Sequence, residues 1–362
     1  MRDTPYLAVD VDRLDRNLAS MAAAARGRGL ALRPHAKTHK CAEIARRQVA
    51  LSGGGLTVAT VAEAEVFAAA GFADLFLAYP VVAVGPRAGR LRALADRVAL
   101  RVGVDSAEGA ALLAAAVPGL PVLVEVDSGH GRTGVAPGAA GGVAAAAAAA
   151  GLSVLGVFTF PGHGYGPGAP ARAAVDEADA LGAAADALRA VGIDPRVVSG
   201  GSTPTAAPSL SARGLSRPGP SGSTPLTELR PGVYAFHDAQ QVELGTATFA
   251  DVALTAVATV VSRGPARAVL DAGGKVLGAD RPGWATGFGR LPACPGARVV
   301  ALSEHHATVA FPDDAPVPAV GERVRVAPNH VCAAVNLADA LVVESGGAEV
   351  DRWAVAARGA NT

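Results

Sequence analysis

The sequence predicts an α/β protein in which a (β/α)8 barrel is followed by an all-β domain. Through the first part of the chain, apolar strand-like runs alternate with helix-like stretches about every 20 to 35 residues, which is the rhythm of βα units. Beyond about residue 245 the helical patterns stop, and short β-like runs are separated by Gly and Pro. We therefore expect a barrel over residues 10–245 and a β domain over residues 246–362, which residues 1–9 join as a further strand.

Eight apolar runs supply the expected barrel strands, and helix-like stretches such as residues 171–190 separate most of them. A doubly wound open sheet is the alternative. It is disfavoured because no Gly-x-Gly-x-x-Gly segment opens the first helix. Residues 209–225 are rich in Pro, Gly and Ser and are expected to form a loop insertion. The expected strands are residues 30–32, 56–59, 75–78, 98–104, 122–126, 154–158, 196–198 and 232–236.

Composition narrows the classes of partner. The 362 residues are 50% hydrophobic and 18% charged, so a large core can form. Lys plus Arg and Asp plus Glu are balanced at 32 each and aromatic residues are few, which disfavours nucleic acid as a partner. We expect no signal peptide and no membrane span, because the chain has no long apolar run. Three cysteines without a close-spaced pair indicate a reducing, cytoplasmic compartment.

The segment after the first expected strand, Arg33–Lys40, is the leading candidate for catalytic chemistry. In a barrel, active sites lie at the carboxyl ends of the strands. Lys37 is the candidate for a Schiff base to pyridoxal phosphate, and such a lysine must be partly neutral to attack a carbonyl. We expect His35, Arg33 and Lys40 to favour the neutral amine. The ordinary alternative is a solvated loop lysine.

Three further strand ends carry candidate ligands for such a cofactor. After the seventh expected strand, two glycines lead to Ser202 and Thr203 at the expected start of a helix, which suits a phosphate. The alternative is a tight turn with an N-cap. Arg132, between glycines, could reach a cofactor phenolate or a substrate carboxylate, although it could equally be a turn arginine. His163 and Tyr165 could flank a planar ring or serve loop packing.

The β domain contains a candidate metal pair, His330 and Cys332. On a strand or extended loop this spacing places both side chains on one face. Imidazole and thiolate suit Zn²⁺, but two ligands are too few for a structural site, so a bound metal would be catalytic. The alternative is a buried cysteine beside an unrelated histidine.

Together these segments resemble the D-serine dehydratase and D-threonine aldolase family. Its members are pyridoxal-phosphate enzymes with an alanine-racemase-like barrel and a C-terminal β domain. The segments that carry the resemblance are Arg33–Lys40 (RPHAKTHK), Asp127–Val135 (DSGHGRTGV), Ser199–Thr205 (SGGSTPT), Glu228–Asp238 (ELRPGVYAFHD), Leu270–Gly273 (LDAG), Leu302–His305 (LSEH) and Pro328–Leu337 (PNHVCAAVNL).

The resemblance implies a role for each candidate residue. Lys37 would be the Schiff-base lysine and the catalytic base. Arg132 and Tyr165 would lie beside the cofactor, and the metal would bind His330 and Cys332. A homodimer is also implied. The residues that would hold the cofactor phosphate are Gly201, Ser202, Thr203 and Tyr234.

The metal pair favours the dehydratase branch, because aldolases of the family tend to carry His-x-Asp and thiolate suits Zn²⁺ better than Mn²⁺ or Mg²⁺. We expect zinc-dependent β-elimination of D-serine, or a similar D-β-hydroxy amino acid, to a 2-oxo acid and ammonia. One alternative is an aldolase that releases glycine and an aldehyde from D-threonine or another D-3-hydroxy amino acid. A second is a non-catalytic pyridoxal-phosphate-binding barrel protein. Phe160 departs from the family pattern, in which a His is common near this position.

Overall fold

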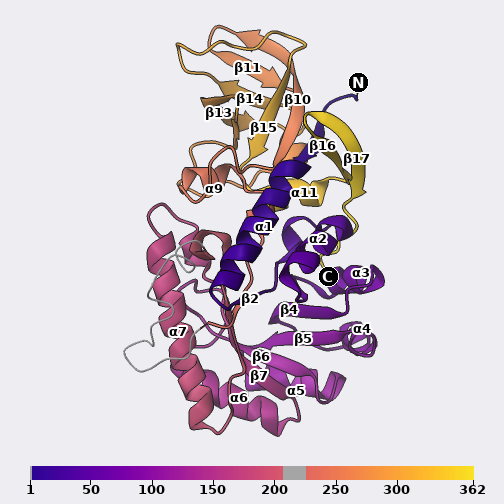
Figure 1. Cartoon of the computed structure of the whole chain (residues 1–362), viewed down its shortest axis with the longest axis vertical. Helices are drawn as coiled ribbons and strands as arrows, with labels where there is room; N and C mark the ends of the chain where they lie inside the picture. Colours follow the sequence, from indigo (N-terminus) through magenta and orange to yellow (C-terminus); the bar gives the residue numbers. More distant parts are fainter. Residues whose placement is uncertain (1, 207–225) are drawn as a thin grey trace. The chain divides into compact units, whose positions relative to one another are not determined.

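The structure, a computed structural model, describes residues 2–206 and 226–362 (Figure 1). The expected loop insertion at residues 209–225 lies outside the described residues. The chain divides into two compact units. The barrel unit comprises Met21–Lys37, Gln48–Gly232 and Ala360–Thr362, and the β unit comprises Met1–Ser20, Thr38–Arg47 and Val233–Gly359.

The barrel unit contains eight parallel strands that follow one another in chain order across the sheet. The terminal strands of this order, β2 and β3, are linked by a parallel bridge between His35 and Thr57, and the Thr57 amide donates to Pro34 O at 2.8 Å. The strand order agrees with the expected barrel, and the His35–Thr57 bridge joins the first and last strands of that order. The strands are β2 (Ala31–Leu32), β9 (Glu228–Leu229), β8 (Val197–Gly200), β7 (Ser153–Phe158), β6 (Pro121–Glu125), β5 (Ala99–Val104), β4 (Asp74–Pro80) and β3 (Leu56–Val58).

The predicted position of the eighth strand was wrong. Residues 232–236 were expected to form it, but the strand is Glu228–Leu229, and Val233–Ala235 forms a 3-10 helix, η4. The prediction relied on hydrophobic pattern, which favours the apolar run at residues 232–236 over a segment that contains the charged Glu228. Glu228 is nevertheless buried, because its carboxylate is paired with arginine inside the barrel.

The helices of the barrel unit are rich in small residues and come close together. Two of them begin with a hydroxyl cap: Thr60 accepts from the Glu63 amide at 3.0 Å and Ser106 from the Gly109 amide at 3.2 Å. On α6, a Cβ added at Gly141 would lie 2.4 Å from Ala187 O of α7, so this helix contact requires glycine. These helices are α3 (Val61–Ala69), α4 (Pro86–Ala95), α5 (Ala107–Ala116), α6 (Ala140–Ala149) and α7 (Pro170–Ala190).

The β unit is built on a closed, antiparallel ring of six strands. β10 (Leu254–Gly264) also pairs with β1 (Tyr6–Asp10), which lies parallel to β16 (Ala340–Ser345), and β17 (Ala348–Ala354) completes the sheet. The N-terminal segment thus supplies a strand beside β10, far from it in sequence. The other ring strands are β11 (Arg267–Leu270), β14 (Ala307–Ala310), β13 (Cys294–Leu302), β12 (Gly289–Leu291) and β15 (Arg323–Pro328).

Further helices of the described residues are α1 (Val11–Gly27), α2 (Ala42–Ser52), α9 (Ala239–Glu243), α10 (Gly274–Leu277) and α11 (Val331–Leu337). Within residues 2–206 and 226–362, none of the helices combines the length and apolar character that a membrane crossing requires.

Adjacent glycines on α6 provide a test of the helix contact. Gly141→Ala should lower the free energy of unfolding by about 1 to 3 kcal/mol, because the new methyl group overlaps Ala187 O. Gly142→Ala should raise it by about 0.5 to 1 kcal/mol, since Gly142 is exposed with open space around it and alanine favours the helix. Urea unfolding of both variants measures the difference, and equal effects would contradict the close contact.

Candidate active site

Lys37 lies at the carboxyl end of β2, in the 3-10 helix η1 (Ala36–Thr38). The backbone before it is held on two sides, because the His35 amide donates to Pro231 O at 3.0 Å and His35 is bridged to Thr57. The Lys37 Nζ atom lies 5.3 Å from the centroid of the Phe160 ring, which is within the range of a cation–π interaction. The predicted position of Lys37, past the first barrel strand, agrees with the structure.

Lys37 faces a cavity of about 290 Å³ in the barrel unit. Its walls come from segments that follow β2, β3, β6, β7 and β9 and from the end of β4, so the cavity lies where barrel enzymes place their chemistry. The volume is near the lower limit of roughly 300 Å³ for small-molecule sites. The lining residues are His35, Lys37, Ala59, Ala78, Tyr79, Arg132, Thr133, Phe160 and Arg230.

The Phe160 ring is the centre of the polar groups around this cavity. Arg132 Cζ lies 5.1 Å from its centroid, and the rings of His130 and Tyr165 lie 5.6 and 6.2 Å away, centroid to centroid. From the sequence alone, Phe160 was only a departure from the family pattern, with no predicted role. Phe160 brings Lys37, Arg132 and Tyr165 together around one apolar ring.

Arg132 is carried by a loop that Asp127 organises. Asp127 Oδ1 accepts from the amides of Gly129 at 2.9 Å and Gly131 at 3.1 Å. Burial by itself raises the pKa of Asp127, but these backbone donors outweigh it and lower that pKa. The carboxylate therefore stays ionised and keeps the loop in one conformation.

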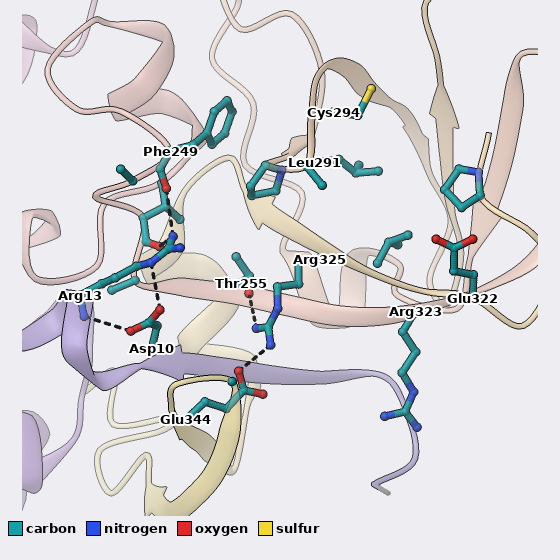
Figure 2. Close-up of a pocket in the computed structure, with 18 of the residues that line it drawn as sticks. Asp10, Arg13, Phe249, Thr255, Leu291, Cys294, Glu322, Arg323, Arg325 and Glu344 are labelled. Carbon is teal, nitrogen blue, oxygen red and sulfur yellow. Dashed lines mark hydrogen bonds and ion pairs between the residues drawn. The ribbon is translucent and has the colours of Figure 1, made fainter. Parts of the chain in front are cut away.

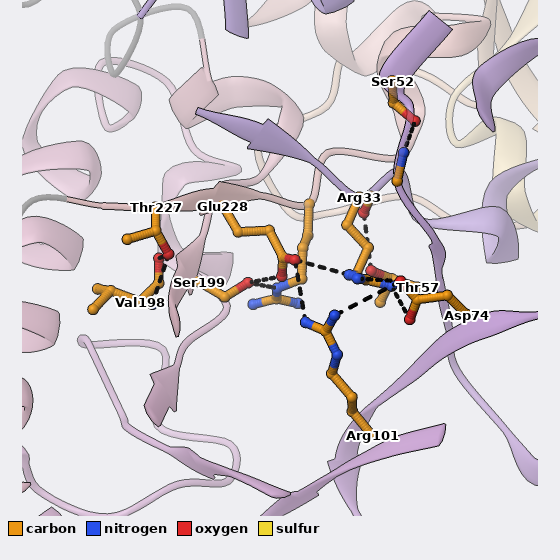
Figure 3. A network of polar contacts seen from close by, with 11 residues as sticks. Arg33, Ser52, Thr57, Asp74, Arg101, Val198, Ser199, Thr227 and Glu228 are labelled. Atoms are coloured by element: carbon orange, nitrogen blue, oxygen red, sulfur yellow. Dashed lines mark hydrogen bonds and ion pairs between the residues drawn. The ribbon is translucent and has the colours of Figure 1, made fainter. Parts of the chain in front are cut away.

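Arg33 does not act as a free cation near Lys37, which corrects the expectation from sequence. It forms a two-point pair with Asp74, at 2.8 and 2.9 Å, and its Nε atom donates to Glu228 at 2.8 Å (Figure 3). Arg101 lies 3.6 to 3.7 Å from the same two carboxylates. The charge of Arg33 is therefore compensated inside the barrel.

The same network reaches the cavity through Arg230. Ser199 Oγ donates to Glu228 at 2.7 Å and accepts from Arg230 Nε at 2.8 Å, while Arg230 Nη2 donates to Thr159 O. Burial lowers the pKa of Arg230, and the charge of Glu228 opposes that effect. Arg230 is a buried cation at the cavity wall that the sequence analysis missed. The eighth strand was predicted at residues 232–236, which placed Arg230 before that strand, whereas Arg230 directly follows the observed strand β9.

The predicted phosphate-binding segment has a buried support that the sequence analysis also missed. Gly201 has φ +86°, a conformation that favours glycine, and its amide donates to Glu177 of α7. The Ser202 amide donates to Thr205 Oγ1 at 3.0 Å, and a helical turn begins at Thr203. Burial raises the pKa of Glu177 to about 7.

The two tyrosines that were predicted to contact the cofactor belong to different units. Tyr165 follows the 3-10 helix η3 (Gly162–Gly164) and lies near Phe160 in the barrel unit. Tyr234 is buried in η4 of the β unit.

His330 is the extended N-cap residue of α11, and Cys332 lies in the first turn of that helix, whereas the sequence predicted a strand or an extended loop for both. The His330 Nδ1 atom lies 3.3 Å from Asp238 Oδ2, which also accepts from the Val331 amide at 3.1 Å. Burial lowers the pKa of His330, but the charges of Cys332 and Asp238 outweigh burial and raise that pKa well above its usual range. With Nδ1 turned to Asp238, the other ring nitrogen is the one available to a metal.

The protein itself supplies few ligands at this position. In residues 2–206 and 226–362, no group of three or more His, Cys, Asp or Glu side chains is arranged to hold a metal ion. Cys332 Sγ lies 3.4 Å from Thr38 Oγ1, and Lys40, expected from sequence to influence Lys37, donates to Asn336 at 2.7 Å.

A larger cavity, about 1130 Å³, lies in the β unit (Figure 2). None of the predicted site residues lines it. Two of its arginines are paired with carboxylates, Arg13 with Asp10 at 2.9 Å and Arg325 with Glu344 at 2.5 Å.

Comparison with known families covers most of the chain. Residues 9–239 match the family described as alanine racemase, N-terminal domain, and residues 253–344 match a serine dehydratase domain. A D-threo-3-hydroxyaspartate dehydratase from Delftia sp. (strain HT23) is 34% identical over 360 residues, 91% of each chain. A D-threonine aldolase from Arthrobacter sp. is 35% identical over 374 residues, 99% of this chain and 93% of the relative.

Solved structures agree with these sequence matches. The Delftia dehydratase superposes with a TM-score of 0.86 at 32% identity, covering 98% of this chain and 97% of that one. D-threonine aldolase from Filomicrobium marinum gives 0.85 at 33% identity, covering 99% and 96%. A D-threo-3-hydroxyaspartate dehydratase variant in which a cysteine is replaced by alanine, solved in the metal-free form, gives 0.85 at 30% identity, covering 98% and 97%.

The buried charge network makes a stability prediction. Glu228→Gln should lower the free energy of unfolding by about 3 kcal/mol or more, because it leaves buried arginine charge uncompensated. Asp74→Asn should cost about 1 kcal/mol, since the Asp74 side chain is 35% exposed and water can take over its role. Urea unfolding at neutral pH compares the two, and a larger loss for Asp74→Asn would contradict this view of the network.

Proposed function

The chain belongs to the D-serine dehydratase and D-threonine aldolase family, whose barrel is alanine-racemase-like, and we propose that it dehydrates a D-3-hydroxy amino acid with pyridoxal phosphate. The observation that carries the proposal is Lys37, whose amine faces a cavity that also contains Arg132 and Arg230. D-Serine is the proposed substrate. The proposal includes a closed (β/α)8 barrel, supported by eight parallel strands and the His35–Thr57 bridge.

The residues of the barrel unit fit pyridoxal phosphate. An amine, two guanidinium groups and an aromatic ring surround a cavity of suitable volume. Under the proposal, Lys37 would hold the cofactor through its amine, and Arg132 and Tyr165 would contact it. Gly201, Ser202, Thr203 and Tyr234 hold the phosphate.

The pair of His330 and Cys332 fits a divalent cation. The imidazole is oriented by a buried carboxylate, Asp238, which is the usual arrangement behind a metal-binding histidine. Two protein ligands leave positions for water and substrate, which suits a catalytic ion. Zn²⁺ is proposed because of the thiolate, with Mn²⁺ or Mg²⁺ as the alternatives.

The chain's own groups perform the proton and positioning steps. When bound, the cofactor supplies an electron sink for the electrons left at the substrate α-carbon. Lys37 would accept the substrate α-proton at Nζ. Arg132 pairs with a carboxylate or phenolate oxygen, and Phe160 excludes water from one side of the cavity. His330 and Cys332 hold the cation that assists departure of the β-hydroxyl.

The relatives include both a dehydratase and an aldolase, so an aldolase is a second candidate function. The same residues would serve an aldolase that cleaves D-threonine, and the name of the Delftia relative makes D-threo-3-hydroxyaspartate a further candidate substrate. The cysteine in the metal pair favours dehydration, by the softness of the ligand. We also propose a homodimer in the cytoplasm that acts on a small D-amino acid, with no nucleic-acid or membrane partner.

Products separate the two reactions. The purified protein should release pyruvate from D-serine, and pyruvate and glycine can be measured in parallel with D-serine, D-threonine and D-threo-3-hydroxyaspartate as substrates. Glycine as the main product would favour the aldolase and contradict the dehydratase proposal.

Lys37→Ala should abolish the visible absorption of bound pyridoxal phosphate and reduce turnover by roughly 10² to 10⁴-fold or more, because the base is lost. Absorption spectra before and after addition of the cofactor measure the first effect. A variant that keeps both the visible band and turnover would exclude Lys37 from this role and support a different lysine.

Asp238→Asn should weaken zinc affinity by about 10- to 100-fold, because the neutral amide orients His330 less strongly. The zinc content that remains after dialysis against a chelator measures this affinity. His330→Ala serves as the reference variant, which should retain no zinc. Turnover of the chelated protein should fall and return when zinc is added. Full turnover in metal-free His330→Ala would remove the metal from the proposal.

A further inference from the structure

Glu177 is a buried carboxyl group directly behind the proposed phosphate-binding segment. Its side chain comes from α7 and is 2% exposed. Oε1 accepts from the Gly201 amide, and Thr205 Oγ1 lies 3.3 Å from Oε2. A Cβ added at Gly200 would lie 2.3 Å from Oε1, so the backbone approaches this carboxyl closely. The contacts show that α7 fixes the conformation of the segment through one side chain.

The hydrogen bonds continue from Glu177 to Ser202. Thr205 Oγ1 accepts from the Ser202 amide at 3.0 Å and lies 3.1 Å from Ser202 Oγ, where either hydroxyl can donate. Glu177, Thr205 and Ser202 are all buried, so water does not replace these bonds. The direction of donation along this chain therefore depends on the protonation state of Glu177.

The two protonation states have opposite consequences for an anion at Ser202. When Glu177 is ionised, the Thr205 hydroxyl donates to it, and the Ser202 hydroxyl is drawn toward Thr205. When Glu177 is protonated, its O–H donates to Thr205, Thr205 donates to Ser202, and the Ser202 hydroxyl is available to an outside acceptor. The protonated state also removes a negative charge from behind a bound phosphate.

We propose that Glu177 is a positioning residue for the cofactor phosphate, and that phosphate binding is coupled to uptake of a proton by its carboxyl group. This inference rests on the proposed function, in which Ser202 and its neighbours hold the phosphate of pyridoxal phosphate. Glu177 acts through Thr205, Ser202 and the Gly201 amide, and does not itself contact the ligand.

The charge environment supports this coupling near neutral pH. Burial raises the pKa of Glu177 to about 7, although the Gly201 amide, the charge of Arg230 and the Thr205 hydroxyl each lower it. Among the described residues, Arg230 from the end of β9 is the charged group that acts on Glu177. The neighbouring Asp176 is engaged with Arg172 at 2.7 Å and lies 3.4 Å from His163. A bound phosphate would raise the pKa of Glu177 further, because like charges repel.

The sign of the pH dependence follows. A group whose pKa is higher in the bound state favours binding at low pH, and that advantage is lost as the pH rises through its pKa in the bound state. Below about pH 7 the carboxyl group is already protonated before the phosphate binds, so proton uptake does not reduce the binding free energy. Above about pH 7, each pH unit should weaken phosphate binding by up to about tenfold until the bound pKa is reached.

The test titrates the full-length protein, freed of cofactor, with pyridoxal 5′-phosphate between about pH 6 and about pH 9. Glu177→Gln keeps an acceptor for Gly201 and a donor for Thr205 but cannot titrate. The ratio of wild-type to Glu177→Gln dissociation constants should rise with pH by up to about tenfold per unit, since the ionisation of the ligand itself is common to both. Pyridoxal, which lacks the phosphate, should show no such rise.

Two further variants separate positioning from folding. Asp179→Asn removes an exposed carboxylate from the same helix and should retain the wild-type pH dependence. Below about pH 7, Glu177→Ala should bind the cofactor about 5- to 100-fold more weakly than the wild type, because the Gly201 amide loses its acceptor. Glu177→Gln should restore this affinity.

The outcomes are distinct. Identical pH dependence in the wild type and Glu177→Gln would overturn the coupling, and unchanged affinity in Glu177→Ala would overturn the positioning role. Both results leave Lys37 and the proposed reaction intact. Absence of pyridoxal 5′-phosphate binding by the wild type at every pH would instead overturn the proposed function, and this inference with it.

Discussion

The buried ion pair between Arg33 and Glu228 connects the neighbouring strands β2 and β9 of the barrel unit. Glu228 lies on β9, and its oxygens engage Arg33 after β2 and Ser199 on β8. Arg33 extends to Asp74 on β4. Because these charges are buried, each needs its partner, and the strands that carry them must keep their register. Through Ser199 the same network sets the position of Arg230 at the cavity wall.

A common arrangement recurs behind the proposed functional groups. Asp127 organises the loop of Arg132, Glu177 supports the segment of Ser202, and Asp238 orients His330. In each case a carboxylate accepts backbone or imidazole N–H groups and restricts a mobile segment to one conformation. Sites built in this way are preorganised, so less of the binding free energy is used to order them.

Much of the fold was predictable because the barrel strands are apolar. Seven of the eight expected strands overlap observed ones, since their hydrophobic runs carry the signal that a buried parallel strand requires. The eighth was misplaced because Glu228 is charged, and only its arginine partner makes burial favourable. Similarly, a strand or an extended loop was expected at His330 and Cys332, but Cys332 lies in the first turn of α11, which a two-residue spacing cannot reveal.

The sequence by itself determined the candidate chemistry: an amine at Lys37 past a barrel strand, small residues at Gly201–Thr203, and the imidazole and thiol of His330 and Cys332. These follow from residue type and local position, which the chain order carries. Only the tertiary structure decided that Arg33 is paired with carboxylates, that the Lys37 amine lies over the Phe160 ring, and that Glu177 accepts from the Gly201 amide. Those properties depend on groups distant in sequence, whose burial and pairing exist only once the strands and helices have packed.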